Sequence, residues 1–569
     1  MIPIGRVLGP AEENGQIKIQ TKDNIYTRVG EYLLYKTLVN GEEQEVFAII
    51  ISRCICRNLP ANFLANPSID AGKIASALGL PNALNDIEYE ITANILGYFD
   101  NKLKSFVNPR INPNPNTIIY LPPDEKLSPV LFSAKRNEIA SAYIGNMLLR
   151  PSLDVIVNVD KLVATHFAIL AGTGSGKSYL TRVILEELMQ HYNRAAIAVF
   201  DPHGEYETLN QMSNSKKFEY KDLARNKTYR PEVKIVRPGL DFSINTHELS
   251  FGDIRFLLPD ISEKMSQLLE ELLNEVKNAT RKKNFKWTYS DLLGFLEDKI
   301  EGEEEKKSNN KGTLEALRWR LNSRFDARNK KHKLFVDDGG TSLRELFRPG
   351  QCTVIRLDGL EEREQQVCAA ILLRKVYKAR EAHKNNDENT EPENSLEYPV
   401  FSIIEEAHRF APSGENNSAS NTILKTILSE GRKFGVGVGL ITQRPGKLDQ
   451  NVLSQCMTQF FMRIINPNDQ ESVGKSVEGA GRDLLKELPS LSNGQAIVSG
   501  MAVRTPVLLK VREAYTEHKG DSIESATVWN KFFEEKEEAR REMQTATRKA
   551  NPEDEEADNF EIWLAKGST

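Results

Sequence analysis

The stretch AGTGSGKS, from Ala171 to Ser178, decides the fold of this 569-residue chain. It follows the apolar run Phe167 to Leu170 and precedes a stretch with apolar residues at helical spacing. A strand, a glycine-rich loop and a helix in this order form a P-loop, in which backbone N–H groups surround a phosphate. Ala171 stands where the usual motif has glycine, and it keeps the requirement for a small residue. The sequence therefore predicts a nucleotide-binding α/β domain.

The residues of this loop have separate expected roles. The three glycines supply the backbone freedom that the turn needs. Lys177 is expected to reach the β- and γ-phosphates, and Ser178 to place its hydroxyl on Mg²⁺. ATP and Mg²⁺ are therefore the expected cofactors. The expected cofactor-binding residues are Gly172, Thr173, Gly174, Ser175, Gly176, Lys177, Ser178 and Tyr179.

Composition narrows the class of protein. The chain is long enough for two to four domains, and its 40% hydrophobic and 27% charged residues are ordinary for a globular protein. A net charge of -5 argues against a general nucleic-acid coat protein, so any DNA contact must be confined to particular loops. The five cysteines form no CxxC pair, which indicates a reduced compartment and no structural metal. No run approaches the roughly 20 apolar residues of a membrane span, so we expect a cytoplasmic protein without membrane contact.

The sequence pattern predicts five regions. Short alternating runs separated by Asn14-Gly15 and Asn40-Gly41 indicate a small N-terminal β-barrel. Strand and helix patterns then alternate, as in a parallel sheet covered by helices, and a charged helical segment interrupts them. The expected limits are 1–125 for the barrel, 126–244 and 349–512 for the α/β core, 245–348 for the helical insertion and 513–569 for a charged C-terminal extension. The extension combines a helix, Phe532 to Arg548, with an acidic tail that holds Trp563.

A second apolar run, Val400 to Ile404, ends in two carboxylates. In a protein with a P-loop, one such carboxylate orders the magnesium shell and the next orients the attacking water. We assign Glu405 to the metal, together with Ser178, and Glu406 to the water. Most strands of this kind carry Asp where this chain has Glu405. The alternative is that the acids only favour the start of a following helix.

Two further strand ends carry polar residues. The glycine-rich strand Gly435 to Gly439 leads to Gln443, which is a candidate sensor of the γ-phosphate or the water, or else a turn residue. The strand Ala195 to Val199 leads to Asp201 and Glu205. Ligands of parallel sheets bind beyond the carboxyl ends of the strands, so both residues either approach the nucleotide or cap the next helix.

Hydrolysis at such sites often needs an arginine from a neighbouring subunit, and Arg432 is the first candidate, with Arg150 second. An exposed arginine at a helix end is the alternative for either residue. Basic clusters are either solvated faces or, in a ring, a band of charge that holds phosphates. They are Lys216-Lys217, Arg281-Lys282-Lys283, Lys331 to Lys333, and Arg444 with Lys447.

Taken together, the motifs resemble the HerA branch of the HerA/FtsK superfamily of hexameric DNA-translocating ATPases. In family order from residue 4 to 512 they are IGRV with IYTRVGEYLLY, AGTGSGKS, DPHGEY, IIEEAHRFAP, EGRKFGVGVGLITQRP, INPNDQ, LPSLSNGQAIVSG and TPVLLKVR. The resemblance implies a HAS-barrel-like N-terminal domain, a RecA-like core with a helical-bundle insertion, a C-terminal brace on the neighbouring subunit and a homo-hexameric ring around double-stranded DNA. It also implies a nuclease or NADase effector partner, by analogy bound through the barrel.

Two functions of different class follow. The first is a helicase-type motor that hydrolyses ATP to translocate duplex DNA, with Lys177, Glu406 and Gln443 acting in cis and Arg432 acting across the interface. The second is a ring scaffold that uses ATP as an occupancy signal and regulates an effector, as in antiviral defence. A small-molecule kinase is disfavoured by the chain length, the paired glutamates and the long insertion.

Overall fold

The computed structural model describes residues 1–11, 13–56, 88–103, 105–222, 226–282, 285–305, 310–325, 333–386, 395–414, 418–476, 485–517 and 525–550. The chain forms two compact units, Met1–Glu517 and His518–Thr569. The acidic tail with Trp563 lies outside the described residues, as do the basic residues Lys283 and Lys331. In the described part of the chain, no helix has the length and the apolar character that a membrane crossing requires.

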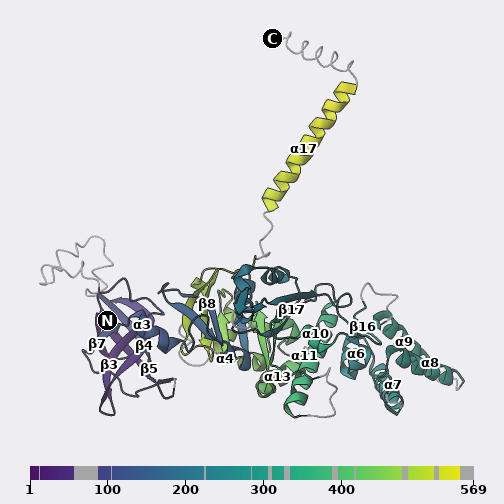
Figure 1. Ribbon diagram of the computed structural model, residues 1–569, viewed down its shortest axis with the longest axis horizontal. Coiled ribbons are helices and arrows are strands. Elements are labelled where there is room, and N and C mark those ends of the chain that lie inside the picture. The colour runs from purple at the N-terminus through teal and green to yellow at the C-terminus, as the bar shows by residue number, and fades with distance from the viewer. Residues whose placement is uncertain are drawn as a thin grey trace, which may run out of the picture. The chain divides into compact units, whose positions relative to one another are not determined.

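The N-terminal strands close into an antiparallel barrel, as predicted (Figure 1). Six strands follow one another in the order β2-β1-β7-β3-β4-β5, and β2 pairs with β5 to complete the ring. Asn40 and Gly41 join β3 to β4 with φ of 53° and 86°, the left-handed conformation that a tight hairpin turn needs. The strands are β1 Ile2–Pro10, β2 Gln16–Thr21, β3 Tyr32–Val39, β4 Glu42–Cys56, β5 Glu88–Asp100 and β7 Ile118–Leu121, with β6 Ser105–Val107 added beside β5.

The predicted α/β core is also present, built on one 11-stranded sheet. Its order is β14-β17-β11-β18-β19-β10-β20-β21-β22-β8-β9, in which β14 to β20 are parallel and the remaining pairs are antiparallel. The strands are β8 Ser141–Met147, β9 Asp154–Asn158, β10 Phe167–Leu170, β11 Ala196–Asp201, β14 Glu232–Val236, β17 Gln351–Arg356, β18 Val400–Ile404, β19 Val436–Thr442, β20 Thr458–Phe461, β21 Gln495–Gly500 and β22 Val507–Val511.

Helices cover this sheet and form the insertion. In α7, Leu269, Leu272, Leu273 and Val276 are buried at the three- and four-residue spacing that is typical of an amphipathic helix. The core helices are α3 Asp124–Leu131, α4 Val159–Ala164, α5 Lys177–Leu188, α11 Glu362–Lys384, α12 Ala407–Phe410, α13 Asn421–Phe434, α14 Gln450–Ser454 and α15 Pro467–Ser476.

The insertion has α6 Phe251–Leu257, α7 Glu263–Lys282, α8 Tyr289–Glu305, α9 Lys311–Phe325 and α10 Leu343–Leu346. The short strands β12 Tyr220–Asp222, β13 Lys227–Tyr229, β15 Ile244–Asn245 and β16 Phe335–Val336 form two small sheets.

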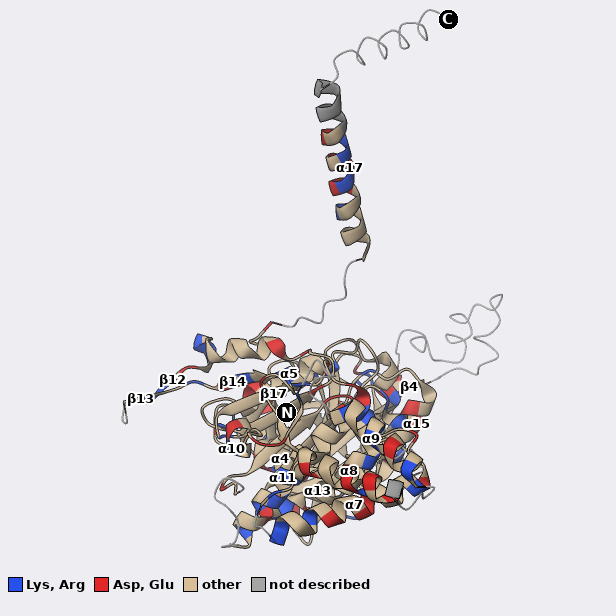
Figure 2. Ribbon diagram, turned by 90° about the vertical axis from the view of Figure 1, so that its right-hand side faces the viewer, with Lys and Arg blue, Asp and Glu red and all other residues tan. Residues whose placement is uncertain are grey.

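The second unit contains the helix α17, Ser525–Ala550, which includes the start of the helix predicted from Phe532. Figure 2 shows acidic and basic residues interspersed along it. The domain limits that the sequence suggests within the first unit remain predictions.

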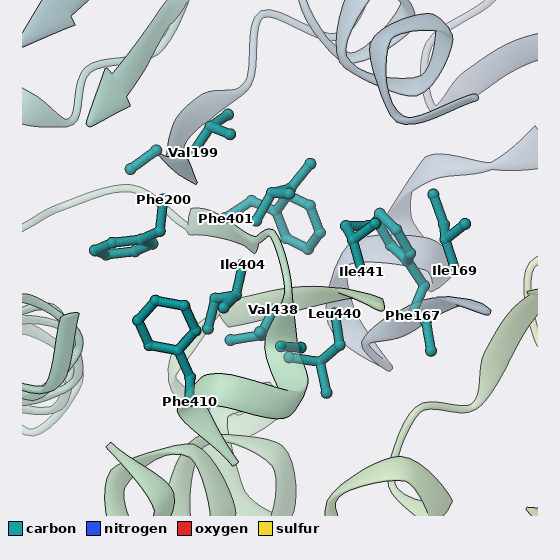
Figure 3. Packing of buried hydrophobic residues seen from close by; sticks show 14 of the residues in the cluster. Phe167, Ile169, Val199, Phe200, Phe401, Ile404, Phe410, Val438, Leu440 and Ile441 are labelled. Carbon is teal, nitrogen blue, oxygen red and sulfur yellow. The ribbon is translucent and has the colours of Figure 1, made fainter. Parts of the chain in front are cut away.

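The centre of the sheet is packed through aromatic rings and close glycine contacts. The Phe167 ring stacks on Phe401 with centroids 5.6 Å apart. A Cβ atom on Gly437 would lie 2.3 Å from a backbone oxygen, and one on Gly439 would lie 2.7 Å from the Phe167 ring. The alternating glycines therefore permit the close approach that the sequence suggested. Figure 3 labels the surrounding core residues Phe167, Ile169, Val199, Phe200, Phe401, Ile404, Phe410, Val438, Leu440 and Ile441.

His166 makes the stability of this core depend on pH. Its Nδ1 accepts the Val438 N–H at 3.1 Å, and burial lowers the pKa of His166 to about 4, although a backbone hydrogen bond with Leu428 opposes the shift. Between pH 6.5 and 4 the unfolded chain binds a proton at this residue and the folded chain does not, so folding loses up to about 3 kcal/mol as the pH falls. We expect His166→Asn, measured by thermal unfolding at pH 7 and 4.5, to show a smaller pH-dependent fall in melting temperature. His383→Gln is the control and should keep the wild-type difference.

Candidate functional site

The P-loop lies between β10 and α5 and is held by the ends of the neighbouring strands. Gly174 and Gly176 have φ of 71° and 98°, which only glycine adopts without strain. The Gly172 N–H donates to the Arg463 carbonyl at 2.8 Å, and a Cβ atom on Gly172 would lie 2.9 Å from that oxygen. The loop therefore requires glycine at these positions, and it directs the first turn of α5 toward the space where a P-loop holds phosphate.

Lys177 is the first residue of α5, and it lies between the two predicted carboxylates. Its ammonium group donates to the carboxylate of Glu405 and, at 3.2 Å, to Oε1 of Glu406. All three side chains are buried. Two buried carboxylates share one cation here, so a phosphate that reached Lys177 would compete with both of them.

Glu406 follows β18 with a strained backbone. Its φ and ψ are 52° and 46°, a left-handed conformation that costs a non-glycine residue about 1–3 kcal/mol and is most often kept at functional sites. Oε1 of Glu406 accepts the Gln443 amide at 2.6 Å, and Gln443 in turn accepts the Thr173 hydroxyl at 3.0 Å. Oε2 is buried and accepts no hydrogen bond from the described residues. Oε1 is therefore occupied by Gln443 and Lys177, whereas the lone pairs of Oε2 remain available to another donor.

His408 is a site residue that the sequence analysis did not single out. Its Nδ1 hydrogen-bonds to the Thr442 hydroxyl at 3.0 Å and lies 3.2 Å from Oε2 of Glu406. Burial lowers the pKa of His408 to about 4, although the charge of Glu406 opposes the shift. The imidazole is therefore neutral near pH 7. The distance to Glu406 is a contact between a carboxylate and a neutral ring, and it is not an ion pair.

Asp201 and Glu205 lie in the turn after β11, and their contacts give them different roles. Asp201 accepts the backbone N–H groups of residues 203–206 at 2.8 to 3.2 Å, so it caps its own turn. Glu205 instead reaches the P-loop, where its carboxylate accepts the Ser178 hydroxyl. The next residue, Tyr206, donates its hydroxyl to Oε2 of Glu405 at 2.7 Å.

The donors around Ser178 and Glu405 fit a magnesium nucleotide. They are a hydroxyl and carboxylate oxygens, the ligands that Mg²⁺ prefers. Among the described residues, no group of three or more His, Cys, Asp or Glu side chains forms a metal site without further ligands. Phosphate oxygens and water would have to complete the shell, as in P-loop proteins, where the metal is bound with the nucleotide.

The two candidate arginines lie in different places. Arg432 is exposed in the last turn of α13, which leads to the start of β19. The P-loop follows the end of β10, and β10 is parallel to β19, so Arg432 lies at the opposite edge of the sheet from its own P-loop. Arg150 is buried and donates to Glu31 at 2.9 Å and Asp124 at 3.0 Å, so its charge is already paired within the chain.

A cleft of ≈ 840 Å³ opens beside Glu406, and its lining includes His408 and Gln443. Five cations line it as well, Arg324, Arg363, Arg409, Arg444 and Lys447, together with the carboxylates of Glu361 and Glu362. Arg324 pairs with Glu361, and Arg363 donates to the Phe256 carbonyl at 2.8 Å. The side chains of Arg409, Arg444 and Lys447 form no hydrogen bond or ion pair with a residue that the structure describes, and their charges contribute to the lowered pKa of His408. Next to Glu406, the cleft therefore offers an anion three cations that have no partner among the described residues.

The C-terminal end of the first unit packs against α5 of its own chain. Arg512 forms buried ion pairs with Glu186 at 2.9 Å and Glu187 at 2.8 Å. The Ala514 N–H donates to the Tyr179 hydroxyl at 2.7 Å. Tyr179, expected to bind the cofactor, is thus tied to residues 512–517, and these residues brace the P-loop helix.

Comparisons with known proteins identify one family. The family described as "Helicase HerA, central domain" matches residues 142–376. The DNA double-strand break repair helicase HerA of Pyrococcus furiosus is 31% identical over 427 residues, 68% of this chain and 74% of the relative. A probable helicase of Methanocaldococcus jannaschii is 29% identical over 469 residues, 79% of this chain and 85% of the relative. Among solved structures, the bacterial conjugative coupling protein TrwB matches with 15% identity and a TM-score of 0.43 over 70% of this chain and 94% of that chain.

Proposed function

This chain belongs to the HerA helicase family, and from that premise we propose that it is a magnesium-dependent ATPase that moves double-stranded DNA through a ring of six copies. One observation carries the proposal. Lys177, Glu406 and Gln443 come from three separate strand ends and meet in one hydrogen-bonded cluster next to the P-loop. A buried cluster of this kind has the parts that hydrolysis of a bound triphosphate needs.

Each residue of the cluster has a separate proposed role in hydrolysis. Bound Mg²⁺ supplies charge neutralisation on the phosphate oxygens, with Ser178 and Glu405 as its expected protein ligands. Lys177 exchanges its contacts with Glu405 and Glu406 for the phosphates. The Gln443 amide remains hydrogen-bonded to Oε1 of Glu406. Oε2 is then the oxygen that accepts a proton from the attacking water.

Contacts with DNA are proposed for the cleft beside Glu406. The exposed side chains of Arg444 and Lys447 line it, and phosphates of a DNA backbone are anions that such cations hold without reading the bases. A phosphate bound there would lie next to Gln443 and Glu406. DNA binding and hydrolysis would then be coupled through neighbouring side chains.

Replacing Arg444 and Lys447 by alanine tests this proposal. We expect wild-type turnover to rise with duplex DNA and the ratio of turnover with and without DNA to fall toward one in the double variant. In a salt titration of DNA binding, the slope of log K against log salt should shrink by about 2, because two phosphate contacts are lost. Lys264→Ala removes an exposed cation that lies outside the cleft and outside the basic clusters, and it serves as the control.

Two outcomes would count against the motor. If DNA still stimulated the double variant as strongly as the wild type, the cleft would not be a DNA-binding site. If the ATP turnover of the wild type were the same with and without duplex DNA, the second function would be favoured. That function is a ring that uses ATP as an occupancy signal and regulates an effector.

We also propose that a nuclease or NADase effector binds the N-terminal barrel, in DNA repair or in defence against phage. The barrel exposes large apolar side chains, among them Leu38 at 67% and Ile55 at 63%. Leu38 pairs with Glu43 at the start of β4 and Ile55 lies near its other end, so the two residues do not form one patch, and the support for this partner is the resemblance of the chain to its family.

A further inference from the structure

The turn after β11 delivers two neighbouring side chains to the nucleotide site, and the mechanism above uses neither. Asp201 fixes this turn by accepting four consecutive backbone N–H groups. Gly204 has a φ of 73°, and a Cβ atom there would lie 3.2 Å from the Arg356 guanidinium. The backbone therefore determines where Glu205 and Tyr206 are directed, and one of them reaches each of the two expected metal ligands.

The contact of Glu205 with Ser178 and the contact of Tyr206 with Glu405 differ in how many oxygen lone pairs they leave free for a cation. Glu405 uses one oxygen for Lys177 and the other for the Tyr206 hydroxyl. Ser178 gives its only proton to Glu205, which leaves the lone pairs of its hydroxyl oxygen for another partner. The pair of Ser178 and Glu205 can therefore accept an oxygen-seeking cation without breaking its own hydrogen bond.

We propose that Glu205 is a magnesium-site residue: it holds the Ser178 hydroxyl proton so that the oxygen lone pairs face the metal of Mg·ATP, and it adds a carboxylate charge beside that metal. This inference rests on the proposed ATPase function and adds one residue to it. Groups that orient a metal ligand in this way commonly change metal affinity about 10- to 100-fold when they are replaced.

The test measures metal-dependent nucleotide binding by the full-length protein, without turnover. Affinity for a fluorescent ATP analogue is determined in excess Mg²⁺ and in EDTA, and Mn²⁺ binding to the nucleotide complex is followed by electron paramagnetic resonance. In Glu205→Gln we expect the tightening by Mg²⁺ to fall at least about tenfold, weaker Mn²⁺ binding, and an affinity in EDTA close to wild type. Glu205→Asp keeps the charge and should recover part of the tightening.

Glu207→Gln is the matched control. It makes the same chemical change two residues along, where the carboxylate lies 3.6 Å from Arg356, and it should keep the full effect of Mg²⁺. An unchanged Mg²⁺ effect in Glu205→Gln would overturn the inference. Equal losses in EDTA and in Mg²⁺ would also overturn it, because they would mean that Glu205 only supports the shape of the loop. If the wild-type protein bound no nucleotide, the proposed ATPase function itself would be wrong.

Discussion

Glu406→Gln is expected to bind ATP with nearly wild-type affinity and to lose at least about 100-fold in turnover, with or without DNA. The amide keeps the size of the side chain and can still pair with Gln443, but it cannot accept a proton from water. Lys177 retains Glu405 as a partner, so the P-loop should keep its shape. Binding of a fluorescent nucleotide and steady-state release of phosphate separate the two effects.

Glu397→Gln is the control for this variant. Glu397 precedes β18 at its other end and forms a surface pair with Arg344 at 3.4 Å, an interaction that contributes little to stability. Its turnover should remain within about twofold of wild type, since surface substitutions usually change stability by less than about 0.5 kcal/mol. If Glu406→Gln retained wild-type turnover, Glu406 would not activate the water and the proposed roles of its contacts with Gln443 and Lys177 would fail with it.

The strands that position this site could be predicted from the sequence because each is a short apolar run that ends in polar residues. β10 and β18 have the bounds that the apolar runs indicated, Phe167–Leu170 and Val400–Ile404. β11 continues beyond the predicted Val199, because Asp201 still pairs with Arg356 of β17. The local pattern gives the strand but not the point where pairing with a distant neighbour stops.

The roles of side chains depend on contacts that no local pattern contains. Asp201 and Glu205 are both acidic residues of one turn, and only the folded backbone decides that one caps the turn and the other reaches Ser178. Arg150 pairs with Glu31, which lies 119 residues away in the sequence. His408 stands in a motif that could be recognised, but its contact with Thr442 requires β18 and β19 to be neighbours.

Arg432→Ala is expected to reduce turnover by about 10³ to 10⁵, the effect of losing an arginine that stabilises charge in phosphoryl transfer. The reason lies in the position of the residue. β19 has 7 residues between Arg432 and the strand end near the P-loop. At about 3.3 Å per residue this amounts to about 20 Å, beyond the reach of an arginine side chain within one subunit. Lys433→Ala, the neighbouring exposed cation, is the control and should stay near wild-type turnover.

Mixed rings test whether Arg432 acts across the interface. Lys177→Ala and Arg432→Ala subunits, co-expressed with different tags and purified through both, are each inactive as homomers on this proposal. In a mixed ring, an intact P-loop meets an intact Arg432 at about a quarter of the interfaces if the subunits assemble at random, so turnover should recover to at most about that fraction. Rings that contain both subunits and remain as inactive as either parent would mean that Arg432 does not serve the neighbouring site. Recovery would mean instead that hydrolysis depends on assembly, because the complete site exists only where two subunits meet.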